Sequence, residues 1–228
     1  MLISVVIPTL NEVAGLSETV ARARANPEVG EIIVADGGSG DGTVDLAERL
    51  ECQVVRATPG RGAQLRAGAA RASGEVVLLL HADTWLPADA GSAVRECLRD
   101  EGVVGGGFWK VFRNAPWFMR GSRARCGLRH WLNQPILGDQ GLFVRRRILE
   151  ESGGVPEVPL MEEFELCRVL RRRGRLVLAP ATVSTSTRRF RQNGVLRTYW
   201  RMSWVTLRYW LGASPAELER IYNKPAKR

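Results

Sequence analysis

The sequence predicts an α/β fold in which a mostly parallel central sheet is flanked by helices. Short apolar runs alternate with helical segments through the first half of the chain, and this alternation is typical of βαβ units. The apolar runs are continuous, so both faces of these strands are expected to be buried. With 228 residues, of which 45% are hydrophobic, the chain is long enough to bury a substantial core.

The individual elements follow from composition and from turn residues. Four strands are expected at 2–7, 31–35, 52–56 and 75–80, with helices between them at 14–25, 44–50 and 63–72. After residue 100 the alternation ends, and we expect strands at 105–112, 142–144 and 175–179, helix plus loop over 113–137, and a helix at 162–173. Gly174 should stop that last helix, and the glycines at 105–107 should allow close approach of another backbone.

The residues from Asn193 onward predict an amphipathic basic helix. Large apolar residues recur there at helical spacing with arginines between them: Val195, Leu196, Tyr199, Trp200, Trp204, Leu207, Trp210 and Leu211, and Arg197, Arg201 and Arg208. Two uses of this helix fit the pattern equally well. It could pack on its own domain or on a second copy of the chain, or it could lie on an anionic membrane surface.

The chain is strongly basic, with a formal net charge of +9 and a sequence pI of about 10.2. This balance favours anionic partners such as nucleotides, nucleic acid or an acidic membrane surface. Signatures of RNA-binding and helix-turn-helix domains are missing, so no nucleic-acid partner is expected. No window of the sequence is apolar enough to cross a bilayer. Four widely spaced cysteines and the lack of a signal peptide predict a cytoplasmic protein, with peripheral attachment to the inner face of the membrane as a variant.

The predicted strand at 75–80 ends at two polar residues, His81 and Asp83. Ligands of open α/β sheets bind beyond the carboxyl ends of such strands, and side chains two positions apart project to the same side. A divalent metal or a phosphate-bearing ligand could therefore sit beside them. On this stretch alone, it is equally compatible that Asp83 caps a helix starting near Pro87.

Four loops of the first half leave the same edge of the predicted sheet, at 8–12, 36–43, 60–66 and 81–83. Glu12 and Asp36 can accept hydrogen bonds from a base or ribose, and Arg61 or Arg66 can meet phosphate. Asp83 can hold Mg²⁺ or Mn²⁺, which usually take few protein carboxylates and complete their shell with phosphate oxygens and water. Each loop by itself also reads as an ordinary turn or helix cap, but four in this order favour a nucleotide site.

These loops resemble the successive motifs of family 2 glycosyltransferases with the GT-A fold, namely Ile-Pro-Thr-Leu-Asn-Glu at 7–12, Asp-Gly-Gly-Ser-Gly-Asp-Gly-Thr at 36–43 and His-Ala-Asp at 81–83. The resemblance implies a nucleotide-sugar site made by Pro8, Thr9, Glu12, Asp36, Gly38, Arg61, His81, Ala82 and Asp83, with Asp83 as the metal ligand. The chain departs from the family pattern twice. Gly37 replaces the second residue of an Asp-Asp-Gly-Ser turn, and His81 replaces the first Asp of the Asp-X-Asp metal motif. His81 could assist the metal, contact the donor, or only shape the turn.

The resemblance continues in the second half of the chain. Gly138, Asp139 and Gln140 resemble the family's acceptor-side loop, and Glu162 and Glu163 resemble the family's Glu-Asp segment, which places Glu163 as the catalytic base with Glu162 beside it. Adjacent carboxylates repel one another and burial raises a carboxyl pKa, which would suit a base near neutral pH. The alternative is a solvated acidic helix start that the helix dipole favours.

The resemblance implies a metal-dependent, inverting transfer of a sugar from a nucleotide-diphosphate sugar to the hydroxyl of a small-molecule or lipid-linked acceptor. The Gln-X-X-Arg-Trp motif of processive synthases is absent, so the transfer is expected to be non-processive. A more specific similarity is to a bacterial subgroup associated with radical-SAM proteins and arsenosugar biosynthesis. The alternative from another class is a non-catalytic basic module that binds a membrane surface or a nucleotide.

The same resemblance divides the chain into regions. Residues 1–190 are expected to form the GT-A domain, with 1–100 as its nucleotide-binding half and 101–190 as its acceptor and catalytic half. Residues 191–228 form the basic, aromatic-rich helical tail.

Overall fold

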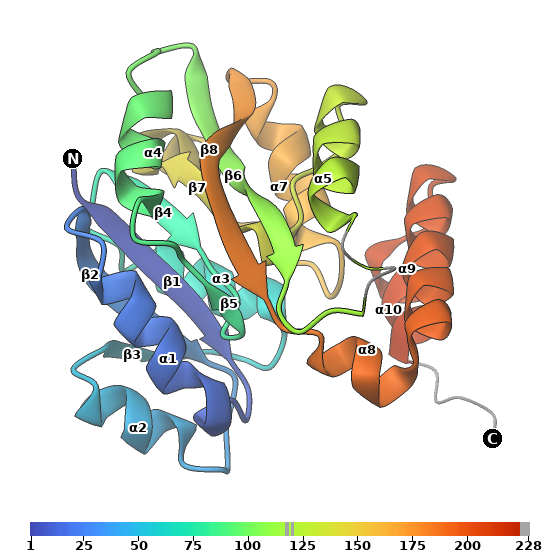
Figure 1. The fold of residues 1–228 in the computed structure, drawn as a ribbon, viewed down its shortest axis with the longest axis horizontal. Helices are drawn as coiled ribbons and strands as arrows, with labels where there is room; N and C mark the ends of the chain where they lie inside the picture. The colour runs from blue at the N-terminus through green and yellow to red at the C-terminus, as the bar shows by residue number, and fades with distance from the viewer. Residues whose placement is uncertain (117–118, 120, 224–228) are drawn as a thin grey trace.

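The computed structural model describes residues 1–116, 119 and 121–223 (Figure 1). Its strands form one sheet, and they are β1 (Ile3–Thr9), β2 (Val29–Asp36), β3 (Gln53–Arg56), β4 (Val76–Leu79), β5 (Thr84–Trp85), β6 (Val103–Phe112), β7 (Leu142–Arg145) and β8 (Arg175–Thr185). The strand order is β3-β2-β1-β4-β7-β6-β8-β5. Residues 117, 118, 120 and 224–228, which belong to the predicted loop and tail, lie outside the described residues.

Helices cover both faces of this sheet. They are α1 (Val13–Arg24), α2 (Thr43–Arg49), α3 (Arg61–Ala69), α4 (Ala90–Cys97), α5 (Ser122–Trp131), α6 (Arg146–Glu151), α7 (Glu162–Leu170), α8 (Arg188–Asn193), α9 (Val195–Trp210) and α10 (Pro215–Asn223), with a short 3-10 helix η2 (Gly138–Gln140). The predicted α/β fold is confirmed, and every strand and helix expected before residue 100 forms within a few residues of its predicted bounds.

The differences from the predicted elements have local causes. Strand β8 continues to Thr185 instead of ending at Ala179, because the sheet accommodates Pro180 at a register shift opposite Phe108 and Trp109. The two-residue β5 and the helix α6 were not expected, whereas α4 begins at Ala90, close to the helix start near Pro87 that the sequence allowed. Beyond Leu211 the predicted tail helix breaks, because Gly212 adopts a positive φ of 87° and α10 starts a new direction.

The first half of the sheet is wholly parallel. Strand β1 pairs with β2 on one side and β4 on the other, and β2 pairs with β3. Strand β7 then enters antiparallel between β4 and β6, so the second half is mixed. The chain therefore reverses its direction of strand addition between β1 and β4, and a crevice forms outside the carboxyl ends of strands at such a point.

Two apolar cores lie on opposite faces of the sheet because successive strand residues point to opposite sides. Val5 and Ile7 of β1 face a core that includes Leu16 of α1, whereas Val6 faces a second core that includes Leu65 of α3. A third, smaller cluster joins Phe164 of α7 to α9 and α10. The tail therefore packs on the domain, as one of its two predicted uses requires. No helix among the described residues is long and apolar enough to span a bilayer.

Strand β6 confirms the expected close approach at its glycines. A Cβ on Gly105 would lie 2.4 Å from the carbonyl oxygen of Phe143, and one on Gly106 would lie 2.3 Å from that of Val177. Neighbouring backbone fills the space that any side chain would need. Glycine at these positions is therefore required by the pairing of β6 with β7 and β8.

We predict that Gly106→Ala lowers the free energy of unfolding by about 1–3 kcal/mol, because backbone atoms cannot move aside as a flexible side chain can. Gly15→Ala in α1 is the matched control, since its Cβ would meet only the Ala82 carbonyl at 3.7 Å. That change should raise the free energy of unfolding by about 0.5 kcal/mol, because alanine restricts the unfolded chain more than glycine does. Urea unfolding of both variants measures the difference, and equal effects would contradict the packing argument.

Candidate active site

A cleft of about 330 Å³ opens at the carboxyl ends of β1 and β4, where the direction of strand addition reverses. Seven of the nine residues predicted for the nucleotide-sugar site line it: Pro8, Thr9, Glu12, Arg61, His81, Ala82 and Asp83. The sequence did not indicate the four others, Leu10, Gln64, Arg188 and Gln192. Arg188 and Gln192 belong to α8, and the run of arginines at 188–191 was the one available signal for them.

The remaining two predicted residues, Asp36 and Gly38, do not line this cleft. Asp36 is 3% exposed and its carboxylate accepts hydrogen bonds from the backbone of Gly38 and Ser39 at 2.9 Å and from the hydroxyl of Thr9 at 3.1 Å. Burial would raise the pKa of Asp36, but these hydrogen bonds, led by those from Ser39, outweigh it and hold that pKa below its ordinary value. Asp36 thus organises the glycine-rich turn.

The first two loops are tied to each other. The Asn11 backbone N–H donates to the hydroxyl of Ser39 at 2.9 Å, and the Gly40 N–H donates to the side chain of Asn11 at 2.9 Å. The Glu12 N–H donates to the hydroxyl of Thr43 at 2.9 Å. These bonds fix the wall of the cleft on which Glu12 stands.

Glu12 is already paired across the cleft. Arg188 of α8 donates to both of its carboxylate oxygens, at 2.6 and 2.8 Å. These two residues are 176 positions apart, so sequence reasoning could place each on its own element without joining them. The pair brings a guanidinium to the same cleft as Asp83.

Asp83 stands at the mouth of the cleft and does not cap a helix. The N-cap of α4 is Asp89, so the predicted capping role for Asp83 is wrong. Arg113 holds the local backbone, because its guanidinium donates to the Asp83 carbonyl at 2.7 Å and stacks 3.6 Å above the Trp85 ring. No described side chain hydrogen-bonds the Asp83 carboxylate.

This arrangement fits a hard divalent cation. Asp83 and His81 both line the cleft, and the buried Nε2 of His81 has no hydrogen-bond partner among the described residues. Within the described part of the chain no three acidic, His or Cys side chains come together to hold an ion. Mg²⁺ and Mn²⁺ commonly take one or two carboxylates and complete their shell from substrate phosphates and water, so one carboxylate is sufficient.

The third loop, 60–66, supplies Arg61, which lies between the cleft and the start of α7. Its Nε donates to Glu162, and its Nη2 lies 3.2 Å from Oε1 of Glu163. Nε2 of His81 is 3.7 Å from the same Glu163 oxygen. The alternative phosphate residue, Arg66, instead donates to the carbonyls of Gly153 and Val155, at 2.8 and 2.9 Å.

Both glutamates at the start of α7 are buried, with 1% and 7% of their surface exposed for Glu162 and Glu163. The solvated acidic helix start that the sequence also allowed is therefore wrong for these two residues. Glu165 fits it better, because it pairs with Arg168 on the outside and accepts from Tyr209 at 2.6 Å.

The two buried carboxyl groups have opposite pKa shifts. Burial would raise the pKa of Glu163, but the Arg61 guanidinium and His81 outweigh it and lower that pKa from 4.5 to about 2. Burial and the neighbouring Glu163 charge raise the pKa of Glu162, and its Oε2 has no hydrogen-bond partner among the described residues. The raised pKa that the sequence predicted for one of these two carboxyl groups is therefore that of Glu162.

The predicted acceptor-side loop, η2, lies directly on this cluster. A Cβ on Gly138 would sit 2.2 Å from Nε2 of His81 and 2.3 Å from Oε1 of Glu163, so a larger residue there would displace these two side chains. Segments around residues 61, 81, 138 and 163 therefore meet at one point, although they are far apart in sequence.

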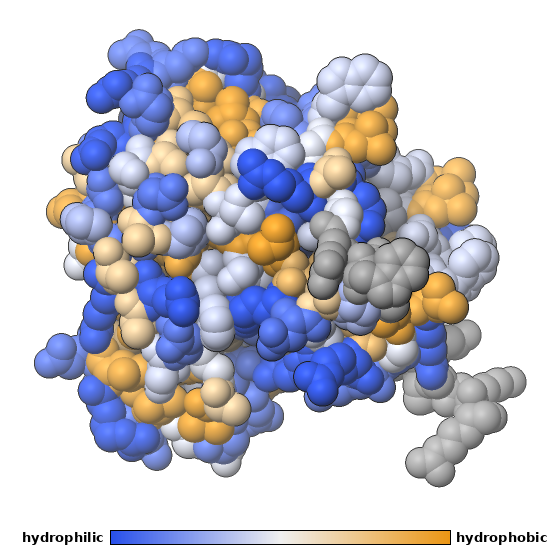
Figure 2. All heavy atoms as spheres, in the orientation of Figure 1, coloured by the Kyte–Doolittle hydropathy of each residue, from blue (hydrophilic) through white to orange (hydrophobic). Residues whose placement is uncertain are grey.

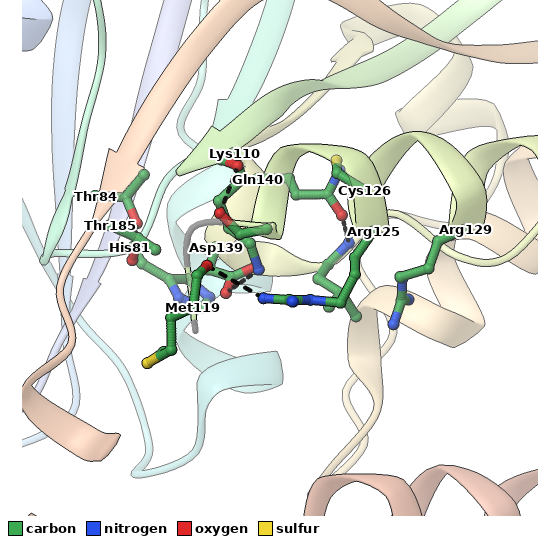
Figure 3. Close-up of polar contacts among 12 residues, drawn as sticks. His81, Thr84, Lys110, Met119, Arg125, Cys126, Arg129, Asp139, Gln140 and Thr185 are labelled. Atoms are coloured by element: carbon green, nitrogen blue, oxygen red, sulfur yellow. Dashed lines mark hydrogen bonds and ion pairs between the residues drawn. The ribbon is translucent and has the colours of Figure 1, made fainter. Parts of the chain in front are cut away.

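The other two residues of η2 differ in role (Figure 3). The Gln140 side chain is used inside the protein, because its amide donates to the carbonyl of Phe108 at 3.2 Å and its oxygen accepts from the backbone of Leu137. Asp139 pairs with Lys110 at 2.6 Å, and its Oδ1 has no hydrogen-bond partner among the described residues. Gln140 thus shapes the loop, whereas Asp139 is held by Lys110 and keeps one buried carboxylate oxygen without a partner among the described residues.

Comparisons with known proteins agree with this geometry. Residues 4–153 match the model of the family described as Glycosyl transferase family 2. Glucosyl-3-phosphoglycerate synthase from Mycobacterium tuberculosis, solved with Mn²⁺, uridine diphosphate and glucosyl-3-phosphoglycerate, is similar at 23% identity with a TM-score of 0.59, over 81% of this chain and 70% of that one. A mannosyltransferase from Pyrobaculum calidifontis, solved with GDP-Man and Mn²⁺, is similar at 17% identity with a TM-score of 0.65, over 96% of this chain and 67% of that one. Among curated proteins, none matches. The similar structures confirm the predicted GT-A fold.

The low pKa of Glu163 predicts how the stability of the fold depends on pH. Because this pKa is lower in the folded protein, the ionised group stabilises the fold above pH 4.5, and the contribution is lost as the pH falls from 4.5 to about 2. The loss is on the order of 3 kcal/mol for Glu163 alone, and Glu162, with its raised pKa, offsets part of it. Chemical unfolding as a function of pH should therefore give a flatter acid limb for Glu163→Gln than for the parent. Parallel curves would show that Arg61 and His81 do not hold this charge.

Proposed function

The chain belongs to glycosyltransferase family 2, and we propose that it transfers a sugar from a nucleotide-diphosphate sugar to an acceptor hydroxyl with inversion at the anomeric carbon. The observation that carries this proposal is the meeting of Arg61, His81, Gly138 and Glu163 beside the cleft that holds Asp83. Family membership makes the chain an enzyme, which excludes the purely non-catalytic module as its main role.

The donor occupies the cleft between the first and fourth loops. Asp83 is the residue that would hold Mg²⁺ or Mn²⁺, and the bound ion would supply charge neutralisation for the diphosphate leaving group. Similar enzymes of this fold were solved with Mn²⁺ and UDP or GDP-Man, which supports both the ion and the class of donor. Arg188, at the same cleft, can turn from Glu12 toward the diphosphate because both are anions.

Glu163 is the proton acceptor in this proposal, with Glu162 beside it. With a pKa near 2, Glu163 is a weak base as long as Arg61 contacts it. An arriving diphosphate competes for Arg61, and when that guanidinium turns to the phosphates, the main cause of the low pKa is removed. Glu163 can then take the proton of the acceptor hydroxyl as its oxygen bonds to the anomeric carbon and the bond to the diphosphate breaks.

The acceptor approaches over η2, which contacts His81 and Glu163 through Gly138 and is held in place by the Asp139–Lys110 pair. Residues 1–100 would then serve as the donor half and 101–190 as the acceptor half. Non-processive transfer, the radical-SAM-associated subgroup and a cytoplasmic location stay predictions from the sequence.

The donor site is tested by Asp83→Asn, with Asp89→Asn as the matched control. Asp89 is exposed at the N-cap position of α4 and its side chain makes no capping hydrogen bond, so the control should behave as the parent. In a thermal-shift panel of UDP-, GDP- and dTDP-sugars, the parent and the control should be stabilised by at least one sugar nucleotide more strongly with Mn²⁺ than without. Asp83→Asn should lose the Mn²⁺-dependent part, and donor turnover should fall by about 10²-fold or more. No shift of the parent with any donor would refute the site.

The base is tested by Glu163→Gln against Glu165→Gln, which lies on the same helix outside the cluster. Transfer or donor hydrolysis should fall by about 10²–10⁴-fold for Glu163→Gln and stay near the parent value for Glu165→Gln. Donor-induced thermal shifts should persist in both variants, because neither change touches Asp83. If Glu163→Gln transfers normally while Glu162→Gln does not, the assignment moves to Glu162.

A further inference from the structure

Helix α9 carries an exposed apolar stripe on the side that faces away from the domain. The stripe consists of Leu196, Trp200, Trp204, Leu207 and Leu211, which recur at four- and three-residue spacing and so lie on one face. Their exposed fractions are 86%, 73%, 43%, 49% and 71%. In Figure 2, pale and orange side chains gather along the right edge, where Figure 1 shows α9. Monomeric proteins rarely leave such a row of large apolar side chains in water.

A different face of the same helix holds it on the domain. Thr198 and Val205 are buried, and the Tyr209 ring packs 5.2 Å from that of Phe164 in α7. Packing on the domain therefore uses one side of α9 and leaves the stripe available. The two uses that the sequence left open for this helix are served by separate faces.

The charge of the C-terminal segment indicates which kind of partner the stripe would bind. Between residues 188 and 228 the sequence has ten Lys and Arg residues and two Glu residues, so this segment carries nearly all of the chain's net charge of +9. No acidic residue occurs between Glu165 and Glu217. Arg191 and Arg197 are exposed where α9 begins. A second copy of the same face would bring like charges together, whereas an anionic surface would be attracted.

We propose that the α9 stripe docks on an anionic lipid bilayer, with the helix lying in the plane of the interface. Tryptophan is favoured at the boundary between head groups and acyl chains, and the leucines of the stripe can enter the apolar layer. At 16 residues α9 is too short to span the bilayer. Leucines cannot stack on bases as aromatic rings do, which favours lipid over single-stranded nucleic acid.

Docking would bring the active-site cleft close to the lipid. Arg188 and Gln192 of α8 line the cleft, and Gly194 alone connects α8 to α9. Under the proposed glycosyl transfer, on which this step rests, the acceptor is then an amphiphilic or lipid-linked hydroxyl compound presented at the membrane surface.

Vesicle flotation tests the docking without requiring catalysis, so its failure would leave the proposed transfer standing. The full chain should float with mixed phosphatidylcholine–phosphatidylglycerol vesicles, should not float with phosphatidylcholine alone, and should dissociate as NaCl is raised. Partitioning should fall roughly tenfold for Trp200→Ser and several-fold for Leu207→Ser. Leu2→Ser is the matched control, because Leu2 is 54% exposed, close to the 49% of Leu207, at the opposite end of the molecule (Figure 1).

Three results would overturn the docking. The parent could fail to bind anionic vesicles, the stripe variants could bind as well as Leu2→Ser, or light scattering could show a dimer that Trp200→Ser converts to a monomer. Circular dichroism of each variant should match the parent, because about half or more of each substituted side chain is exposed.

Discussion

The contact of Arg61 with Glu162 and Glu163 is the interaction on which the rest of the site depends. It joins the N-terminus of α3, in the parallel half of the sheet, to the N-terminus of α7, in the mixed half. Two carboxylates with 1% and 7% exposure would be strongly unfavourable without a cation beside them. Burial by itself would lower the pKa of Arg61, but the two carboxylates outweigh it and raise that pKa. The charges therefore stabilise one another only because both halves of the domain are in place.

The same logic recurs at the mouth of the cleft. Arg188 bonds both oxygens of Glu12, as Arg61 bonds the glutamates below. Each guanidinium that could serve a diphosphate is thus held by a carboxylate, and an incoming diphosphate would compete with both. Glu12, Glu162 and Glu163 thus hold Arg188 and Arg61 at the cleft, near the positions where a bound donor would contact them. The anion of the donor then completes an electrostatic arrangement that the protein already contains.

Much of the fold and part of the site follow from the sequence. The strands before residue 100 are continuous apolar runs bounded by turn residues, so the local sequence pattern predicts where each strand ends. The same pattern predicts the loops that carry Glu12, Arg61 and Asp83. Sequence reasoning did not single out Arg188, and it did not decide which of the two adjacent glutamates has the raised pKa. Neither depends on neighbouring residues in the chain: Arg188 meets Glu12 across 176 positions, and the Glu163 pKa is governed by Arg61 and His81.

In the C-terminal tail, too, the sequence determines which helix forms and the tertiary structure determines what that helix contacts. The spacing of apolar residues from 195 to 211 determines that a helix forms, and the arginines determine its charge. Only the tertiary structure decided which apolar residues pack inward, because Val205 and Tyr209 meet the ring of Phe164, whereas Trp200 and Leu207 have no such partner among the described residues and stay exposed. The sequence alone thus determined which elements exist and which edge of the sheet carries polar loops. The three-dimensional arrangement decided which charges meet and which are left facing water, since pairwise electrostatics and packing depend on distances that separation along the chain does not encode.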